Sequence, residues 1–322
     1  MVGFSYSLRC VVFHNISATN SPFTTGMSVD TTPQSFERTL RFLTSHYRPV
    51  SLEDVLSNCE GRGLPSRALL VTFDDAYASV AEYAAPLCKQ LGAPAVFFVN
   101  AAFVDNQRLA PDNLICYVAN VLGLASINTA IRTVWGDKAA PVGSLTEVFG
   151  IFLPSLSLAE REAFLEVLRK LAGISERQAA QEAGLYLTAE QLRTLKSFNF
   201  ELGNHTYTHT YFRSLSRNDF GSEIDRNKNE LESMSGTNVR SFSQPYGSSK
   251  DLSSELRDYL NNSGHHAIFL SESVANPRSP DLFRLDRINS RAQNDKTLFL
   301  EIEVLPRLRA IRNRILQNPA EA

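Results

Sequence analysis

Short apolar segments alternate with helical patterns along most of this chain, and this alternation limits its possible folds more than any other feature. The first three segments are LRCVVF at 8–13, ALLVTF at 68–73 and PAVFFV at 94–99. Pro33 opens a helical pattern between the first two, with Phe36, Leu40 and Leu43 on one face. Because strands that alternate with helices pair in parallel, the sequence predicts an α/β fold.

The alternation breaks once and then resumes. Residues 105–187 contain no convincing strand but several helical patterns, one of them running from a capping box at Ser157–Glu160 to Gly173. Further strand candidates follow at 200–202, 239–242, 266–270 and 283–288. We therefore expect one domain over 1–295 with a helical insertion at about 105–187, and an amphipathic helix and tail over 296–322. Without the 83 residues of the insertion, 239 of the 322 residues remain, which is the usual size of a single barrel domain.

Charge and hydropathy exclude some partners. The chain has 32 Lys and Arg against 34 Asp and Glu, a net charge of −2, so we expect no nucleic-acid partner. No apolar run reaches about 18 residues, so we expect no transmembrane helix. The C-terminal arginines favour a solvated helix face over a peripheral membrane contact; they are Arg307, Arg309, Arg312 and Arg314. The oligomeric state stays open.

The cysteines and the N-terminal residues bear on the cellular compartment. Cys10, Cys59, Cys88 and Cys116 are widely spaced and form no CxxC pair, so we expect buried free thiols. The first residues lack a basic region before a long apolar stretch, which speaks against a secretory signal, although a trimmed chain would read the same. The expectation is a cytoplasmic protein.

Two adjacent carboxylates end the strand at 68–73. Asp74 and Asp75 follow Thr72-Phe73, and the carboxyl ends of strands are where α/β folds place their active sites. One carboxylate can bind a metal ion while its neighbour acts as a base. The alternative is a helix N-cap, which is a common use of aspartate.

Two histidines follow the strand candidate at 200–202. His205 and His209 are four residues apart, so on a helical turn both imidazoles would lie on one face and reach one metal ion. The alternative is a pair of surface histidines. Together with one carboxylate they would form a His–His–Asp set that leaves a position open for water. A Pro-Tyr-Gly turn at 245–247 follows a later strand, and its backbone N–H groups could face an oxyanion.

The ordered motifs TFDD, HTxxH and PYG, each after a strand, resemble the polysaccharide deacetylases, the family of the NodB homology domain and carbohydrate esterase family 4. The resemblance runs from about 8 to 288, apart from the insertion. The segment FHNIS at 13–17 is similar to a branch whose first strand ends in Tyr-His or Phe-His, which includes circularly permuted deacetylases of poly-N-acetylglucosamine. The resemblance implies a distorted (β/α)7 barrel.

It also implies roles for individual residues. Asp75, His205 and His209 would hold a divalent ion, most often zinc. Asp74 would be the general base that takes a proton from metal-bound water, the nucleophile. Tyr246 would offer its backbone N–H to the oxyanion.

Two departures from the family pattern concern the catalytic residues. No late Leu-x-x-His follows Gly247 to supply the general acid, and in the permuted branch that acid comes from the first strand, so His14 becomes the candidate. Its alternative is a buried structural histidine. The arginine that many members carry before the Pro-Tyr-Gly turn is also missing. Arg287 is either its replacement or part of a surface salt bridge with Asp286 or a neighbouring residue.

The resemblance predicts a metal-dependent amide hydrolase that removes an acyl group, acetyl first, from an N-acetylated amino sugar or glycan intermediate. A formyl group or another small amide fits the same chemistry. The competing hypothesis is a catalytically inactive barrel that binds a glycan or a partner protein. The two departures favour inactivity, whereas the intact Asp74, Asp75, His205 and His209 speak against it.

Overall fold

The computed structural model describes residues 8–57, 63–247, 249–277, 279–290 and 294–317. Cys59, the side chain of Arg314 and residues 318–322 of the expected tail lie outside this described part. Cys10, Cys88 and Cys116 are buried free thiols, as expected.

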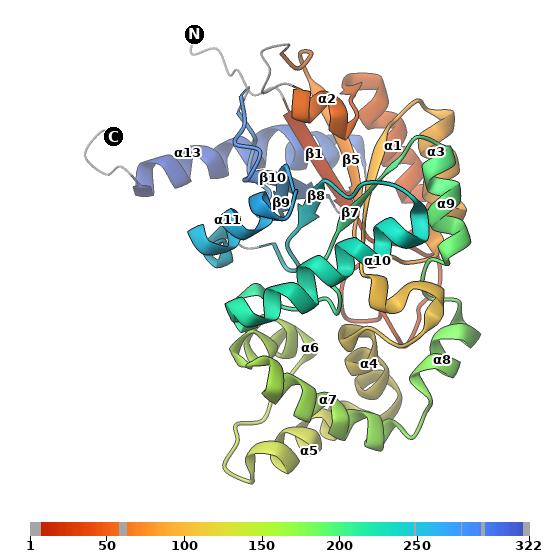
Figure 1. The fold of residues 1–322 in the computed structure, drawn as a ribbon, viewed down its shortest axis with the longest axis vertical. Helices are drawn as coiled ribbons and strands as arrows, with labels where there is room; N and C mark the ends of the chain where they lie inside the picture. Colours follow the sequence, from red (N-terminus) through yellow and green to blue (C-terminus); the bar gives the residue numbers. More distant parts are fainter. Residues whose placement is uncertain (1–7, 58–62, 248, 278, 291–293, 318–322) are drawn as a thin grey trace.

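Seven parallel strands close into a barrel (Figure 1). They are β1 (Leu8–Phe13), β5 (Ala68–Phe73), β6 (Ala95–Val99), β7 (Glu201–Asn204), β8 (Ser241–Ser243), β9 (Ala267–Leu270) and β10 (Leu285–Asn289). The ring closes at β1, where Cys10 lies opposite Leu70 on one side and Arg287 on the other. The predicted (β/α)7 barrel is therefore confirmed.

The sequence located the long strands well and missed the short ones. The strands at 8–13 and 68–73 have the predicted bounds, and the later strands are shifted by one or two residues at an end. Three strands of two residues each were not predicted, because two residues are too few to show a periodic hydrophobic pattern. They are β2 (Asn15–Ile16) and β3 (Asp30–Thr31), which pair with each other, and β4 (Arg48–Pro49), which pairs with the start of β5.

Side chains alternate between the two faces of the barrel wall. Leu8 and Cys10 of β1 join Leu70, Phe98 and Phe269 in one interior cluster, which α2 (Leu52–Ser57) also contacts. The intervening residues face outward against helices, among them α1 (Pro33–His46), α3 (Ala85–Gln90), α9 (Ala189–Ser197) and α10 (Arg226–Ser235). Because successive side chains of a strand point to opposite faces, the residues that continue the interior series at the carboxyl ends face the mouth of the barrel.

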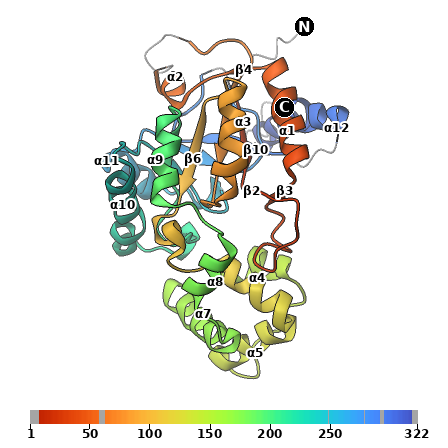
Figure 2. The ribbon, with the colours of Figure 1, turned by 90° about the vertical axis from the view of Figure 1, so that its right-hand side faces the viewer.

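Five helices occupy the expected insertion, namely α4 (Pro111–Tyr117), α5 (Leu124–Trp135), α6 (Leu145–Glu147), α7 (Leu158–Ala172) and α8 (Glu176–Ala183). They lie together below the barrel in Figures 1 and 2 and share a hydrophobic cluster, to which Phe23, Tyr77 and Tyr211 from outside the insertion also belong. The capping box at Ser157 and the left-handed Gly173 begin and end α7 as predicted. The stretch contains no strand, and Tyr186 alone makes an isolated bridge, to Tyr77.

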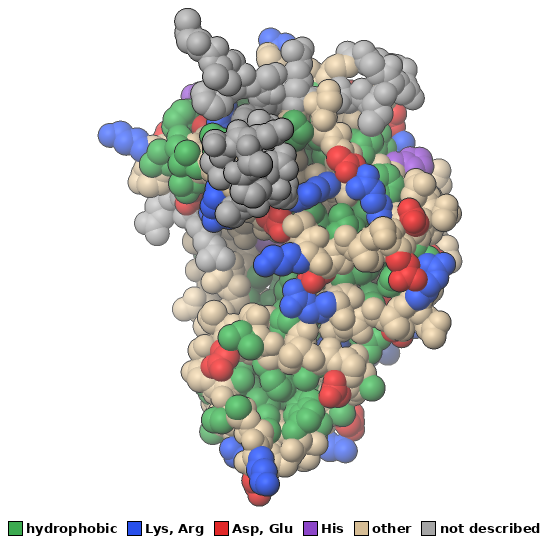
Figure 3. Space-filling view, turned by 90° about the vertical axis from the view of Figure 1, so that its left-hand side faces the viewer, with side chains coloured by type: hydrophobic (Ala, Val, Ile, Leu, Met, Phe, Trp, Pro, Cys, Tyr) green, Lys and Arg blue, Asp and Glu red, His purple; other side chains and the backbone are tan. Residues whose placement is uncertain are grey.

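The remaining helices are α11 (Ser254–Asn262), α12 (Asp295–Phe299) and α13 (Leu305–Gln317). Acidic and basic side chains are interspersed over the upper part of the face in Figure 3, and hydrophobic ones gather lower down. Among the described residues no single helix is long and apolar enough to span a membrane. A π-helical turn extends α4 to Leu122. The helices Pro111–Leu122 and Leu124–Trp135 are long and apolar enough only when they are counted together, and they are bent by 119° where they meet.

Candidate active site

A cavity of about 230 Å³ opens at the carboxyl ends of the strands. Six residues singled out from the sequence line it: His14 after β1, Asp74 and Asp75 after β5, His205 and His209 after β7, and Tyr246 after β8. Arg287, the seventh, lies directly behind Asp74. The fold thus brings all seven to one place.

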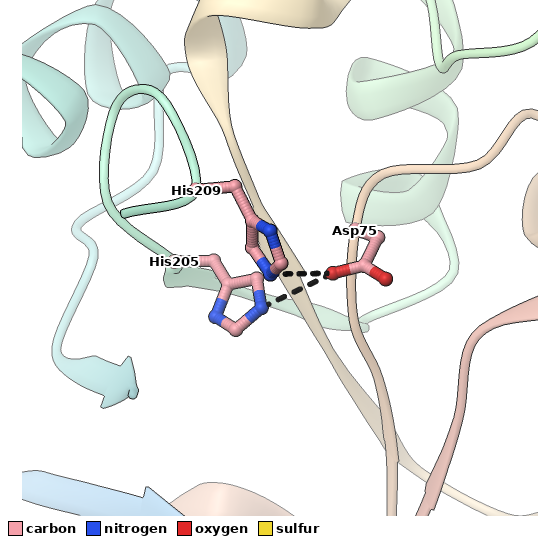
Figure 4. Close-up of side chains that lie close together, drawn as sticks. All are labelled: Asp75, His205 and His209. Carbon is pink, nitrogen blue, oxygen red and sulfur yellow. Dashed lines mark ion pairs between the residues drawn. The ribbon is translucent and has the colours of Figure 1, made fainter. Parts of the chain in front are cut away.

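Asp75, His205 and His209 converge on one point (Figure 4). Oδ1 of Asp75 lies 3.2 Å from Nε2 of His205 and 3.3 Å from Nε2 of His209. The three ligand atoms all lie within 4.8 Å of one another. Both imidazoles are buried, so few water molecules compete for these atoms.

The outward nitrogens of both histidines are already engaged. Nδ1 of His205 lies 2.7 Å from the carbonyl oxygen of Ser243, and Nδ1 of His209 lies 2.8 Å from Oδ2 of Asp112. Since both partners are acceptors, each Nδ1 donates and each Nε2 faces Asp75. Histidines that bind metals in proteins are usually oriented by such an outer hydrogen bond, so this donor set fits a divalent ion.

The electrostatics of the site agree with that fit. Burial lowers the pKa of His209, but the carboxylates of Asp75 and Asp112 outweigh it and raise the pKa to about 8. Burial raises the pKa of Asp75, yet His209 and His205 bring it well below its usual value. The centre therefore favours a positive charge, either as a proton or as a bound cation.

The prediction that His205 and His209 share a helical turn is wrong. β7 ends at Asn204, and the following segment is a loop in which Thr206 and His209 have left-handed φ of 63° and 53°. Hydrogen bonds from side chains to the backbone of this loop replace the backbone hydrogen bonds of a helix. Nδ2 of Asn100 donates to the carbonyls of His205 and Thr206, and Oδ1 of Asn204 accepts from the Thr206 N–H. The imidazoles meet through this loop rather than through helical spacing.

Asp74 and Arg287 form a buried two-pronged ion pair. Nη1 of Arg287 lies 2.6 Å from Oδ1 of Asp74, and Nη2 lies 2.7 Å from Oδ2. Nη2 also donates to the hydroxyls of Ser243 and Ser271. Burial raises the pKa of Asp74, but the guanidinium outweighs it, so this pKa lies below its usual value. Arg287 is fully buried, so the alternative of a surface salt bridge with Asp286 is wrong.

His14 directly follows β1, continues its interior series of residues and faces the same cavity. Burial lowers the pKa of His14, although Asp75 and Asp74 act in the opposite direction. His265, two residues before β9, is fully buried and is not among the residues that line the cavity. It is hydrogen-bonded to Asn204 and Ser263 instead.

Sequence reasoning missed Asp112, which lies on α4 in the insertion. Its carboxylate accepts from Nδ1 of His209 and, at 2.8 Å to each oxygen, from the phenol of Tyr246. Burial and the nearby Asp112 raise the pKa of this phenol well above its usual value. An acidic residue after Pro111 reads only as the first turn of a helix. No local pattern could connect it to a residue 97 positions away.

Comparisons with known proteins bear on the family and the fold. Residues 61–268 match the family model described as Polysaccharide deacetylase. No curated protein sequence matches this chain.

Solved structures match over most of the chain at low identity, which shows the fold alone. The Streptococcus pyogenes deacetylase PplD, in complex with acetate, has 15% identity and a TM-score of 0.60, and the match covers 92% of this chain and 98% of that one. IcaB from Ammonifex degensii has 18% identity and a TM-score of 0.56, with 91% and 94% covered. A de-N-acetylase from Aggregatibacter actinomycetemcomitans has 15% identity and a TM-score of 0.57, with 91% and 99% covered.

Proposed function

Because this chain belongs to the polysaccharide deacetylase family, hydrolases of carbon–nitrogen bonds, we propose that it is a metal-dependent N-deacetylase of an N-acetylated amino sugar or glycan. One observation carries this proposal. The candidate metal ligands Asp75, His205 and His209 and the Asp74–Arg287 pair meet at one cavity at the mouth of the barrel.

Asp75, His205 and His209 would hold the divalent ion, and their mixed nitrogen and oxygen donors suit zinc. A bound zinc ion supplies Lewis acidity, which lowers the pKa of water and polarises a carbonyl group.

Asp74 has the position of a general base. Its Oδ2 lies 3.8 Å from Nε2 of His205, so the carboxylate borders the ligand set. Arg287 keeps Asp74 ionised and, by donating a hydrogen bond to each carboxylate oxygen, holds it in one orientation. An ionised, oriented carboxylate beside the reacting centre can take up a proton from water.

His14 follows β1 and Tyr246 follows β8, and these two residues complete the proposed machinery. Among the residues that the structure describes, the N–H of Tyr246 has no hydrogen-bond acceptor, so it is free to bind a developing oxyanion. His14 lines the cavity across the barrel mouth and would protonate the leaving amine.

The cavity suggests how a substrate would bind. Met27, Val29 and Phe149 add apolar side chains to its lining, which suits a small acyl group. A second cavity of about 650 Å³ shares His14, Ser28, Val29 and Asn289 with the first and is lined largely by hydroxyl and amide side chains. Such a lining suits the hydroxyl groups of a sugar. A formyl or another small amide substrate uses the same machinery, and a cytoplasmic location stays a prediction.

Arg287 weakens the case for an inactive barrel. The arginine that is missing before the Pro-Tyr-Gly turn has a spatial substitute, because Arg287 reaches Asp74 from β10. The missing late histidine has a candidate substitute in His14.

The proposal predicts that Asp74→Asn binds zinc like the native chain but loses acetate release by roughly a factor of 10² or more, because the base is removed and the ligands are kept. Asp75→Asn should lose the metal as well. The measurement combines metal content with acetate release from N-acetylated glucosamine oligomers. Bound zinc in the native chain with no release from any amide substrate would establish the inactive barrel.

The role of His14 has its own test. His14→Ala should lower kcat by roughly 10²-fold, since general acids typically contribute that much, and leave zinc content unchanged. His46→Ala, an exposed histidine on α1, is the control and should keep native turnover. Near-native turnover of His14→Ala would exclude the acid role.

A further inference from the structure

The loop that carries His209 lies between the barrel and the insertion. His209 adopts a left-handed backbone there, with φ of 53°, a conformation that persists only where surrounding groups hold it. The groups that hold it come from both sides of the loop.

Two helices of the insertion hold opposite parts of His209. Asp112 on α4 accepts a hydrogen bond of 2.8 Å from the imidazole Nδ1. Arg161 on α7 donates from Nη1 to the carbonyl oxygen of His209 at 3.3 Å, and from Nη2 to Oγ1 of the preceding Thr208 at 3.0 Å. Asp112 is 3% exposed and Arg161 is 7% exposed, so water cannot readily replace either contact.

The barrel side holds the same loop through Glu223. Its carboxylate accepts from the N–H of Thr208 at 2.9 Å and from Oγ1 of Thr208 at 2.7 Å. Thr208 is thus held between Glu223 and Arg161 of the insertion. Tyr211, two residues beyond His209, donates from its hydroxyl to the carbonyl of Phe149, again in the insertion.

The other two ligands follow strands of the barrel, although the residue after Asp75 also contacts the end of the insertion, where the N–H of Leu187 donates to the carbonyl of Ala76. His205 is oriented by the backbone carbonyl of Ser243 at the end of β8, and Asp75 directly follows β5 and Asp74. The two imidazoles therefore rest on different parts of the molecule.

We propose that the helical insertion is a positioning module for the metal site, in which Asp112 and Arg161 hold His209 so that its Nε2 meets Asp75 and His205. This rests on the metal site of the proposed function. Asp112 fixes the ring and its tautomer, and Arg161 fixes the backbone from which the ring projects. The insertion thereby sets the affinity for the metal, independently of any contact with substrate.

The test is zinc affinity, measured by competition with a chromophoric chelator. Asp112→Ala and Arg161→Ala should each bind zinc about 10- to 100-fold more weakly than the native chain, the usual effect of losing an orienting partner. Arg169→Ala is the matched control: it lies on the same helix as Arg161, but its ion pairs are to Glu162 and Glu176 within the insertion. It should bind zinc within about twofold of the native chain.

Positioning has a spectroscopic signature that general destabilisation lacks. The visible absorption bands of cobalt bound in place of zinc should change in Asp112→Ala and Arg161→Ala but not in Arg169→Ala, because they report ligand geometry. Excess zinc should restore much of the lost turnover. Asp112→Leu and Arg161→Met roughly keep side-chain volume but cannot make these hydrogen bonds, so they decide the matter if an alanine variant does not fold.

Native zinc affinity and native cobalt spectra in the folded Asp112 and Arg161 variants would overturn this inference and leave the proposed function standing. A native chain that binds no zinc would overturn both together.

Discussion

At the scale of single residues, the pairing of Arg287 with Asp74 stands out, because the two are 213 positions apart and both are buried. Breaking a buried ion pair leaves an uncompensated charge, so the fold depends on both partners. The guanidinium matches the carboxylate with two parallel hydrogen bonds, which an ammonium group cannot reproduce. Charge and orientation at Asp74 are therefore separable by mutation.

Arg287→Lys should keep the positive charge and lose the orientation. We expect kcat to fall about tenfold or more while zinc content stays native, because a base displaced from its working geometry loses much of its effect. Steady-state kinetics at saturating zinc measure this. Arg284→Lys, at an exposed position on the same segment, is the control. Equal kcat in Arg287→Lys and the native chain would mean that charge alone is sufficient.

At the scale of elements, β7 contains a glycine, Gly203, at a point where the side chain of Phe98 approaches its backbone closely. A Cβ at Gly203 would lie 2.2 Å from Cδ1 of Phe98 and 3.0 Å from Oγ of Ser241. Phe98 has little room to withdraw, since its ring packs on Phe269 and lies under the Arg287 guanidinium. The glycine is required by this close approach, directly below the loop that carries the histidines.

Gly203→Ala should destabilise the protein by about 1–3 kcal/mol, the usual cost of overpacking a core. Urea unfolding gives the difference in free energy. The control is Gly221→Ala, because a Cβ there meets nothing within 4 Å, and it should be neutral or stabilising by up to about 1 kcal/mol. Equal stability of the two variants would show that Phe98 moves aside freely.

At the scale of the whole molecule, the last helical segment is tied to the first strand. Glu303, between α12 and α13, receives hydrogen bonds from Arg9 of β1 at 2.9 Å and from Tyr47 after α1, and it pairs with Arg307. Arg9 and Glu303 are both buried although 294 positions separate them. The two described ends of the chain are thereby joined on the outside of the barrel.

Glu303→Gln should therefore lower stability by about 3–5 kcal/mol at neutral pH, because Arg9 keeps a buried charge without its partner. Burial raises the pKa of Glu303, but Tyr47 and Arg9 outweigh it and lower the pKa below its ordinary 4.5. A carboxylate whose pKa is lower in the folded state stabilises the folded protein at pH values above its unfolded-state pKa. This stabilisation is lost as the pH falls through its folded-state pKa. The difference in unfolding free energy between the native chain and Glu303→Gln, measured with urea, should thus become smaller below about pH 4.5. A difference independent of pH would contradict the ion-pair account.

The sequence by itself determined the α/β fold and most of the candidate site, and the family resemblance of its motifs added the barrel. Apolar strands in alternation with helices leave few arrangements, and in parallel strands the carboxyl ends meet at one end of the barrel. Asp74, Asp75, His205, His209 and Tyr246 each follow a strand, so their meeting was predictable.

The tertiary structure decided the rest, for a physical reason common to every case. The contacts of Arg287 with Asp74 and of Asp112 with His209 join residues that are 213 and 97 positions apart, and local periodicity carries no information at such separations. The loop shape at His209 was also beyond the sequence, because side chains of Asn100 and Arg161 from distant elements satisfy its backbone. Local pattern placed the reactive residues at the barrel mouth, and long-range packing decided which partner orients each of them.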